Sequence, residues 1–100
     1  MLQSVLVKKT NLNYRYQNAQ SLELKYFLIS GEYGDPEIPV HKGYGVNIKL
    51  CSPGKILDEK TFEDIDTSME RMVSMIGFFC DKAVTPANLQ YVLEDTLGQF

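Results

Sequence analysis

The fold is decided by residues 66–98, which read DTSMERMVSMIGFFCDKAVTPANLQYVLEDTLG. Thr67, followed three residues later by Glu70, forms a capping box that satisfies the free backbone donors at the start of a helix. Thr85 and Pro86 are the start signal of a second helix, with threonine as the N-cap and proline at the first helical position. The sequence therefore predicts two consecutive helices near its C-terminus.

Both predicted helices carry an apolar stripe at helical spacing, which is typical of helices that pack on a core. Met75 and Phe78 lie beside the first stripe and extend it over a second face. Gly77 lowers helix stability by about 1 kcal/mol relative to alanine, so we expect a strand or the second helix to pass close to it. Gly98 occupies the position of a C-cap glycine. The stripes comprise Met69, Met72, Val73, Ile76, Phe79, Cys80 and Ala83 in the first helix, and Leu89, Val92, Leu93 and Leu97 in the second.

The chain before these helices alternates between apolar and polar side chains, as strands do when one face packs on a core. The last such segment is rich in Asp and Glu, which suits an edge strand because charge discourages unwanted pairing. The predicted strands are residues 2–10, 14–16, 22–33, 44–51 and 56–65.

Strands grouped first and helices grouped last favour an α+β fold. We expect an antiparallel sheet of three to five strands, followed by two C-terminal helices packed on one face. A chain of 100 residues suits a single hydrophobic core. The prediction is one domain, with the sheet in residues 1–65 and the two-helix layer in residues 66–100.

Composition and charge exclude several classes of protein. With 44% hydrophobic and 23% charged residues, the chain has the composition of a soluble globular protein. Residues 1–60 hold eight Lys and Arg against six Asp and Glu, whereas residues 61–100 hold two against seven. Acidic helices argue against nucleic-acid binding, which depends on contacts to phosphate. No apolar run approaches 18 residues, so we expect no membrane span and a cytoplasmic protein with reduced thiols.

His41 is the only histidine, and it lies in an irregular, proline-flanked segment, residues 35–43. One titratable residue without convergent partners is not a catalytic motif. Cys51 and Cys80 lack the spacing of a zinc site and read as small core residues. We therefore predict no catalytic residue, no metal and no cofactor. The alternative is a small-ligand protein or enzyme that uses the 35–43 loop, with His41 beside a carboxylate or Cys51.

The acidic pair Glu94 and Asp95 lies near the C-terminus of the second predicted helix, where negative charge is mildly unfavourable. We favour a solvated helix face as the explanation, and a contact with a partner is the alternative. Gly43 and Gly45 flank Tyr44 without the helix that a phosphate-binding loop needs. We expect Gly45 to let a helix or an aromatic ring pack close to the sheet.

Two segments resemble a family of short bacterial proteins of unknown function. One is Val84-Thr85-Pro86-x-x-Leu89-x-x-Val92-Leu93-Glu94-Asp95, which is similar to the C-terminal helix of that family. The other is the strand Tyr44-Gly45-Val46-Asn47-Ile48, which is similar to its central Tyr-Gly-Ile/Val strand. The resemblance implies a small cytoplasmic α+β domain and brings no activity, cofactor or catalytic residue.

We expect a protein that binds another protein, or a second copy of itself, without catalysis. Methionine-rich and aromatic surfaces are adaptable binders, and a large exposed apolar patch marks an interface. The candidate interface residues are Met75, Phe78, Glu94 and Asp95.

Overall fold

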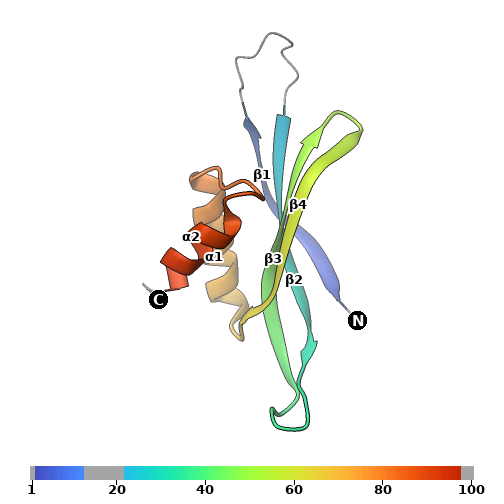
Figure 1. The fold of residues 1–100 in the computed structure, drawn as a ribbon, viewed down its shortest axis with the longest axis vertical. Coiled ribbons are helices and arrows are strands. Elements are labelled where there is room, and N and C mark those ends of the chain that lie inside the picture. Colours follow the sequence, from blue (N-terminus) through green and yellow to red (C-terminus); the bar gives the residue numbers. More distant parts are fainter. Residues whose placement is uncertain (1, 13–21, 98–100) are drawn as a thin grey trace.

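A computed structural model describes residues 2–12 and 22–97 of the chain. It contains a four-stranded antiparallel sheet followed by two helices, which confirms the predicted α+β fold. The strands lie side by side in chain order, and both helices stand on one face of the sheet (Figure 1). The elements are β1 (Gln3–Leu12), β2 (Leu22–Tyr33), β3 (His41–Ser52), β4 (Lys55–Asp66), α1 (Met69–Asp81) and α2 (Leu89–Leu97).

The predicted strands agree closely with the observed ones. β2 has the predicted bounds, and β4 forms an edge of the sheet, as its charge indicated. β3 begins earlier than expected because His41 already pairs with Tyr33, which shortens the irregular segment predicted at residues 35–43. The predicted strand at residues 14–16 and the C-cap at Gly98 lie outside the described residues.

The core lies between the sheet and the two helices. Even-numbered side chains of β2 and β3 point toward the helices, because residues along a strand alternate between its faces. The Tyr26 hydroxyl donates a hydrogen bond of 2.9 Å to the Val84 carbonyl, which ties the sheet to the link between α1 and α2. The core residues are Leu24, Tyr26, Val46, Ile48, Met72, Met75, Ile76, Phe79, Val84, Leu89 and Leu93.

Helix α1 begins one residue later than the capping box predicted. The N-cap is Ser68, whose hydroxyl accepts a hydrogen bond from the Arg71 amide at 3.2 Å. The Asp66 carboxylate accepts from the Ser68 amide at 2.8 Å, which sets the chain direction before the helix. The assignment of Thr67 as N-cap is therefore wrong, because a neighbouring hydroxyl of the same kind fills the role.

Helix α2 begins at Leu89, later than the signal at Thr85 and Pro86 predicted. Residues 85–88 instead form a turn, in which the Asn88 amide donates to the Thr85 carbonyl at 3.1 Å. Before this turn α1 ends at Asp81 with Lys82 as its C-cap, and Ala83, the next residue, adopts the left-handed conformation with φ of 51°. Left-handed residues commonly end helices because they turn the chain away from the helix axis.

The buried face of α1 is rotated from the predicted stripe. Met69 and Val73 are 47% and 37% exposed, whereas Met75 is only 3% exposed. The buried set is Met72, Met75, Ile76 and Phe79, which follows the i, i+3, i+4, i+7 spacing of one helix face. Apolar residues on two faces gave the sequence two possible stripes, and packing on the sheet selected one.

Gly77 of α1 does not accommodate a neighbouring element, contrary to expectation. A Cβ atom at Gly77 would meet only the side chain of Lys8, at 3.7 Å, which is an ordinary contact. The flexible lysine chain reaches the helix from β1, and no backbone of a strand or of α2 is among these contacts. Gly77 therefore has no packing reason in the described structure.

Candidate functional site

The helices cover only one face of the sheet, and no described element covers the other face (Figure 1). We call it the open face. Its residues are the odd-numbered side chains of β2 and β3 and the side chains that stand directly opposite them on β1 and β4. They include Leu6, Lys9, Lys25, Phe27, Ile29, Tyr33, His41, Asn47, Lys49, Glu59 and Thr61.

A row of lysines crosses the open face. The strand register places Lys9 opposite Lys25, Lys25 opposite Lys49, and Lys49 opposite Glu59. Neighbouring strands lie about 4.8 Å apart, so the three lysine Cα atoms fall within about 10 Å. Like charges directly opposite one another are destabilising. The lysine row, Lys9, Lys25 and Lys49, is therefore a band of positive charge in a chain whose net charge is -3.

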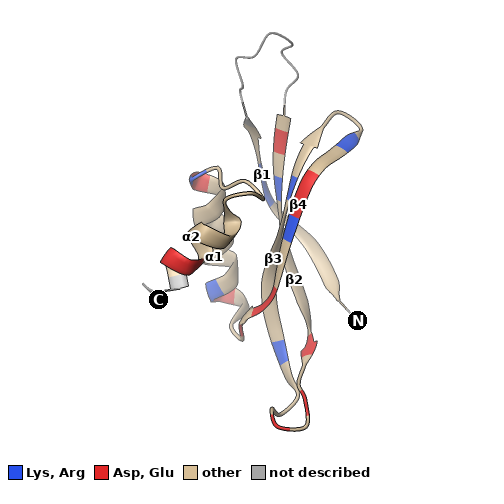
Figure 2. Cartoon of the chain, in the orientation of Figure 1, with Lys and Arg blue, Asp and Glu red and all other residues tan. Residues whose placement is uncertain are grey.

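Two contacts within the sheet partly neutralise or position this band. The Lys25 amine lies 3.7 Å from the Glu23 carboxylate, and both side chains are about one-third exposed. The Lys49 amine lies 4.8 Å from the centre of the Phe27 ring, a cation–π contact. Lysines lie on all four strands, whereas α2 carries acidic residues and no basic one (Figure 2).

Apolar side chains adjoin the lysine row. Leu6 stands opposite Phe27 in the register and is 46% exposed. Leu2 is 52% exposed and lies against Gly31, where a Cβ atom would stand 2.9 Å from the leucine Cδ2. Ile29, the next residue of β2 on the open face after Phe27, is buried. The open face thus combines exposed apolar surface with positive charge.

Asn47 is a buried polar residue near the centre of the open face. It is 6% exposed, and its Nδ2 donates to the Thr61 Oγ1 at 2.7 Å and to Glu59 Oε2 at 3.4 Å. Its Oδ1 is buried and has no hydrogen-bond partner among the described residues. A buried acceptor without a donor costs about 1–3 kcal/mol. Asn47 therefore links β3 to β4 while leaving one acceptor unsatisfied.

His41 lies toward the other end of the open face, in contact with Asp64 of β4. Its Nε2 is 3.0 Å from both oxygens of the Asp64 carboxylate, and its Nδ1 is 3.1 Å from the Pro39 carbonyl oxygen. Carbonyl and carboxylate oxygens only accept hydrogen bonds, so the protonated ring, in which both nitrogens donate, satisfies both contacts. The Pro39 hydrogen bond, followed by the Asp64 carboxylate, raises the pKa of His41.

In its protonated form, which satisfies both contacts, His41 has no free lone pair. A general base or a metal ligand needs one neutral ring nitrogen, and both nitrogens of His41 are engaged. The alternative pairing with Cys51 is also excluded, because the two residues lie at opposite ends of β3. At about 3.3 Å per residue, their backbones are roughly 33 Å apart. His41 does lie beside a carboxylate, as that alternative supposed, and its contact with Asp64 connects β3 to β4.

Two glycines allow β4 to approach β3 closely at this point. A Cβ atom on Gly43 would overlap Asp64 Oδ1, and one on Gly45 would overlap the Phe62 carbonyl oxygen. Asp64 has φ of 51° and lies where the register of β4 shifts. The expectation that Gly45 accommodates a helix or an aromatic ring is wrong, since the neighbour is the backbone of the adjacent strand.

Tyr33 lies across the glycines next to this contact. Cβ atoms on Gly31 and Gly43 would stand 3.1 Å from its Oη and 2.9 Å from its Cδ2. Burial, followed by the Glu63 and Asp64 carboxylates, raises the pKa of Tyr33. Its hydroxyl is buried with no partner in hydrogen-bond geometry within the described part of the chain. The tyrosine therefore shields this end of the open face as a neutral phenol.

The four predicted interface residues fall in different environments. Met75 is in the core, so the apolar patch expected around Met75 and Phe78 is wrong for the methionine. Phe78 is 41% exposed, with the Lys82 amine 5.8 Å from its ring centre. Glu94 and Asp95 are both exposed on α2. The structure does not bring Phe78 and the acidic pair together with His41.

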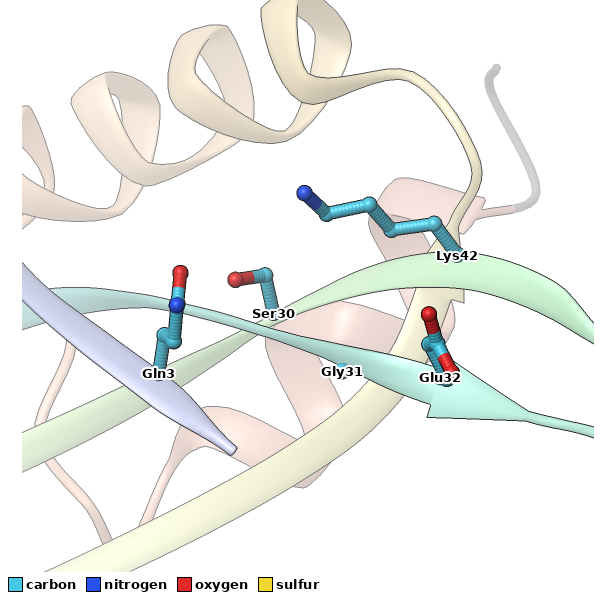
Figure 3. Close-up of a pocket in the computed structure, with 5 residues that line it drawn as sticks. All are labelled: Gln3, Ser30, Gly31, Glu32 and Lys42. Atoms are coloured by element: carbon cyan, nitrogen blue, oxygen red, sulfur yellow. The ribbon is translucent and has the colours of Figure 1, made fainter. Parts of the chain in front are cut away.

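A polar hollow of about 310 Å³ lies on the helix-covered face, beside the start of α1. The side chains of Gln3, Ser30 and Lys42 project from the sheet toward α1 (Figure 3). Glu32 supplies a negative charge beside the positive charge of Lys42, so the hollow has no clear preference for a charged ligand. Within residues 2–12 and 22–97, no three His, Cys, Asp or Glu side chains are placed to hold a metal ion.

Sequence reasoning missed the lysine row. Lys8 and Lys9 are adjacent in the sequence, but their side chains point to opposite faces of β1, where Lys8 pairs with Tyr26 and Lys9 pairs with Lys25. The sequence did contain a signal: each of three strands has a lysine at a position that faces away from the core. Alternation within one strand shows which side chains face away from the core. Only the register between strands places the three lysines side by side.

No helix among the described residues is long and apolar enough to cross a membrane. Comparison with curated proteins gives no match, and neither does comparison with solved structures. Comparison with protein-family models does give a match, to a family of unknown function, DUF6514, over residues 5–99. Because that match covers nearly the whole chain, the protein belongs to family DUF6514.

Proposed function

We propose that the protein is a non-catalytic protein-binding domain and that the open face is its binding surface. One observation carries the proposal: a sheet face that no described element covers combines exposed apolar side chains with a row of three lysines that Glu23 and Glu59 only partly neutralise. Exposed apolar surface of this kind favours contact with a partner, and charge around it selects the partner. A cytoplasmic location stays a prediction from the sequence.

The geometry at His41 supports binding over catalysis. Its two ring nitrogens hold the Pro39 carbonyl and the Asp64 carboxylate, so acid–base chemistry would first require breaking a charge-assisted contact. The alternative of a ligand site in the 35–43 loop predicts that a small molecule raises the melting temperature. In that case the substitution His41→Ala would abolish the effect.

A photo-crosslinking amino acid on the open face tests the proposal. Leu6, which is 46% exposed, is replaced by the probe, and Val73, which is 37% exposed on α1, is the matched control. Irradiation in the native cells should yield a covalent adduct with a protein from position 6 and none from position 73. If position 6 yields no adduct with any protein, the open face is not a binding surface and the proposal fails.

A further inference from the structure

We infer that the occupant of the open face is helix α2 of a second copy of the chain, so that copies associate head to tail. The inference rests on the proposed function, because it names the partner of the same surface. The proposed contact joins the lysine row of one copy to an acidic face of α2 on the other copy.

The outer face of α2 carries one aromatic ring and two carboxylates. Tyr91 is 69% exposed, and Glu94 and Asp95 follow it at three and four positions. Residues at this spacing are neighbours on one helix face. Exposed tyrosines are common anchors of protein interfaces because they combine a large apolar ring with a polar tip. This face, Tyr91, Glu94 and Asp95, is the acidic face of α2.

The acidic face is electrostatically unfavourable within its own copy. Carboxylates in the last turn of a helix face the negative end of the helix dipole, and the last turn of α2 contains no basic residue. Residues 98–100, Gly-Gln-Phe, add no positive charge to the sequence. A cation supplied by another molecule would therefore stabilise this end of α2.

The lysine row keeps one positive charge in excess of the neighbouring Glu23 and Glu59, and its size matches the acidic face. Its Cα atoms fall within about 10 Å across the strands, and four residues of helix rise about 6 Å. A helix laid across the strands can therefore place both carboxylates of the acidic face against the row. In the same position Tyr91 meets the apolar surface of Phe27 and Leu6, beside the amine of Lys49.

The position of the two surfaces requires two copies. α2 stands on the helix-covered side of the sheet, whereas the lysine row lies on the opposite side (Figure 1). One copy cannot bring its own α2 to its own open face without unfolding the core. A contact between different surfaces of two copies is heterologous, and it continues from copy to copy unless a ring closes.

The expected association is weak and depends on salt. A single helix of nine residues offers a contact well below the roughly 1,200 Å² of a stable interface. Charge pairs at such a contact lose most of their attraction in about 1 M salt, where the Debye length is about 3 Å. An unrelated acidic protein would satisfy the same lysines, so the test must identify the occupant.

Charge exchange between two variants makes that identification. The first variant is Lys9→Glu/Lys25→Glu, which makes the open face negative. The second is Glu94→Lys/Asp95→Lys, which makes the acidic face positive. Lys55→Glu/Lys60→Glu is the control, since both lysines are exposed on β4 away from the lysine row and the charge change is the same. Circular dichroism confirms that each variant remains folded.

Sedimentation of each protein over a dilution series in low salt gives the result. The wild type and the control should exceed the monomer mass of 11.4 kDa as concentration rises, and should return to it in high salt. Each charge variant alone should associate at least about tenfold more weakly, since like charges then face each other. Mixing the two charge variants should restore association, because every contact between them again joins opposite charges.

Three results would overturn the inference: a wild type that stays monomeric in low salt, unchanged association of either charge variant, or no recovery on mixing. The probe at position 6 separates this failure from failure of the proposed function. An adduct with a different protein would leave the open face as a binding surface while removing α2 as its occupant. An adduct that maps to α2 of another copy supports both.

Discussion

The Tyr26 hydroxyl donates a hydrogen bond of 2.9 Å to the backbone carbonyl of Val84, which lies 58 positions later in the chain. Tyr26 is fully buried in the centre of β2, and Val84 lies three residues after the end of α1 at Asp81. Burial raises the pKa of Tyr26, so the phenol keeps its proton and remains a donor at neutral pH. This one bond fixes where the link between the helices meets the sheet.

Tyr26→Phe should lower the free energy of unfolding by about 1–3 kcal/mol, because the Val84 carbonyl would be buried without its donor. Urea denaturation monitored by circular dichroism measures the change. Tyr91→Phe removes the same hydroxyl from a residue that is 69% exposed, and it should change stability by less than about 0.5 kcal/mol. Equal stability of the two variants would contradict the role assigned to Tyr26.

Substituting alanine at two glycines should have opposite effects. Gly45→Ala places a Cβ atom on the Phe62 carbonyl oxygen, so β4 must move, at a cost of about 1–3 kcal/mol or more. Gly77→Ala meets only ordinary contact with Lys8 and should gain about 0.5–1 kcal/mol through higher helix propensity. Melting temperatures of the two variants check the signs. A destabilised Gly77→Ala would mean that α1 packs more closely at this residue than described.

Two methionines of α1 test the observed rotation of the helix. Met75→Ala empties a position that is 3% exposed and should cost about 2–5 kcal/mol. Met69→Ala removes the same side chain from a position that is 47% exposed, and its effect should stay below about 1 kcal/mol. Chemical denaturation of both variants compares them directly. If Met69→Ala were instead the more destabilised variant, the buried face of α1 would be the stripe predicted from the sequence.

The contact with Asp64 should be visible in the titration of His41, the only histidine. Hydrogen bonds to Pro39 and Asp64 raise its pKa, so an NMR titration should give a value above the usual 6.5 or so. Asp64→Asn removes the charge and suits the left-handed backbone, which asparagine tolerates. The pKa of His41 should then fall. A pKa that does not change in this variant would show that the contact is absent in solution.

The same shift predicts how stability depends on pH. The pKa of His41 is higher in the folded than in the unfolded chain, so its contribution is fully present below the unfolded value of about 6.5. It is lost as pH rises through the folded pKa, because both states then carry the neutral ring. Relative to His41→Ala, the wild type should therefore lose stability over that interval. Urea denaturation in a pH series measures the difference between the two proteins.

Several features of the fold could be predicted because their signals are local. Alternation located β2 with its observed bounds, and charge identified β4 as an edge. The capping signals were less accurate, because Thr67 and Ser68 are chemically equivalent caps and only the backbone direction chooses between them. The start of α2 was also predicted too early, because residues 85–88 form a turn before the helix.

The candidate surface was harder to predict. Exposed carboxylates at Glu94 and Asp95 were recognised from their position near a helix end, which is a property of one element. Met75 was assigned to a surface because two apolar stripes overlap on α1, and the sheet buried it. The lysine row and the contact between His41 and Asp64 depend on register, which no single strand contains.

By itself, the sequence determined the type and order of the elements, the edge position of β4 and the family resemblance. Side-chain periodicity and turn chemistry act over a few residues, so they can be read from the sequence without the structure. Only the tertiary structure decided which face of α1 is buried, and which lysines stand side by side. Both depend on how strands pair and shift at their bulges, since a slip of one residue sends every side chain to the opposite face.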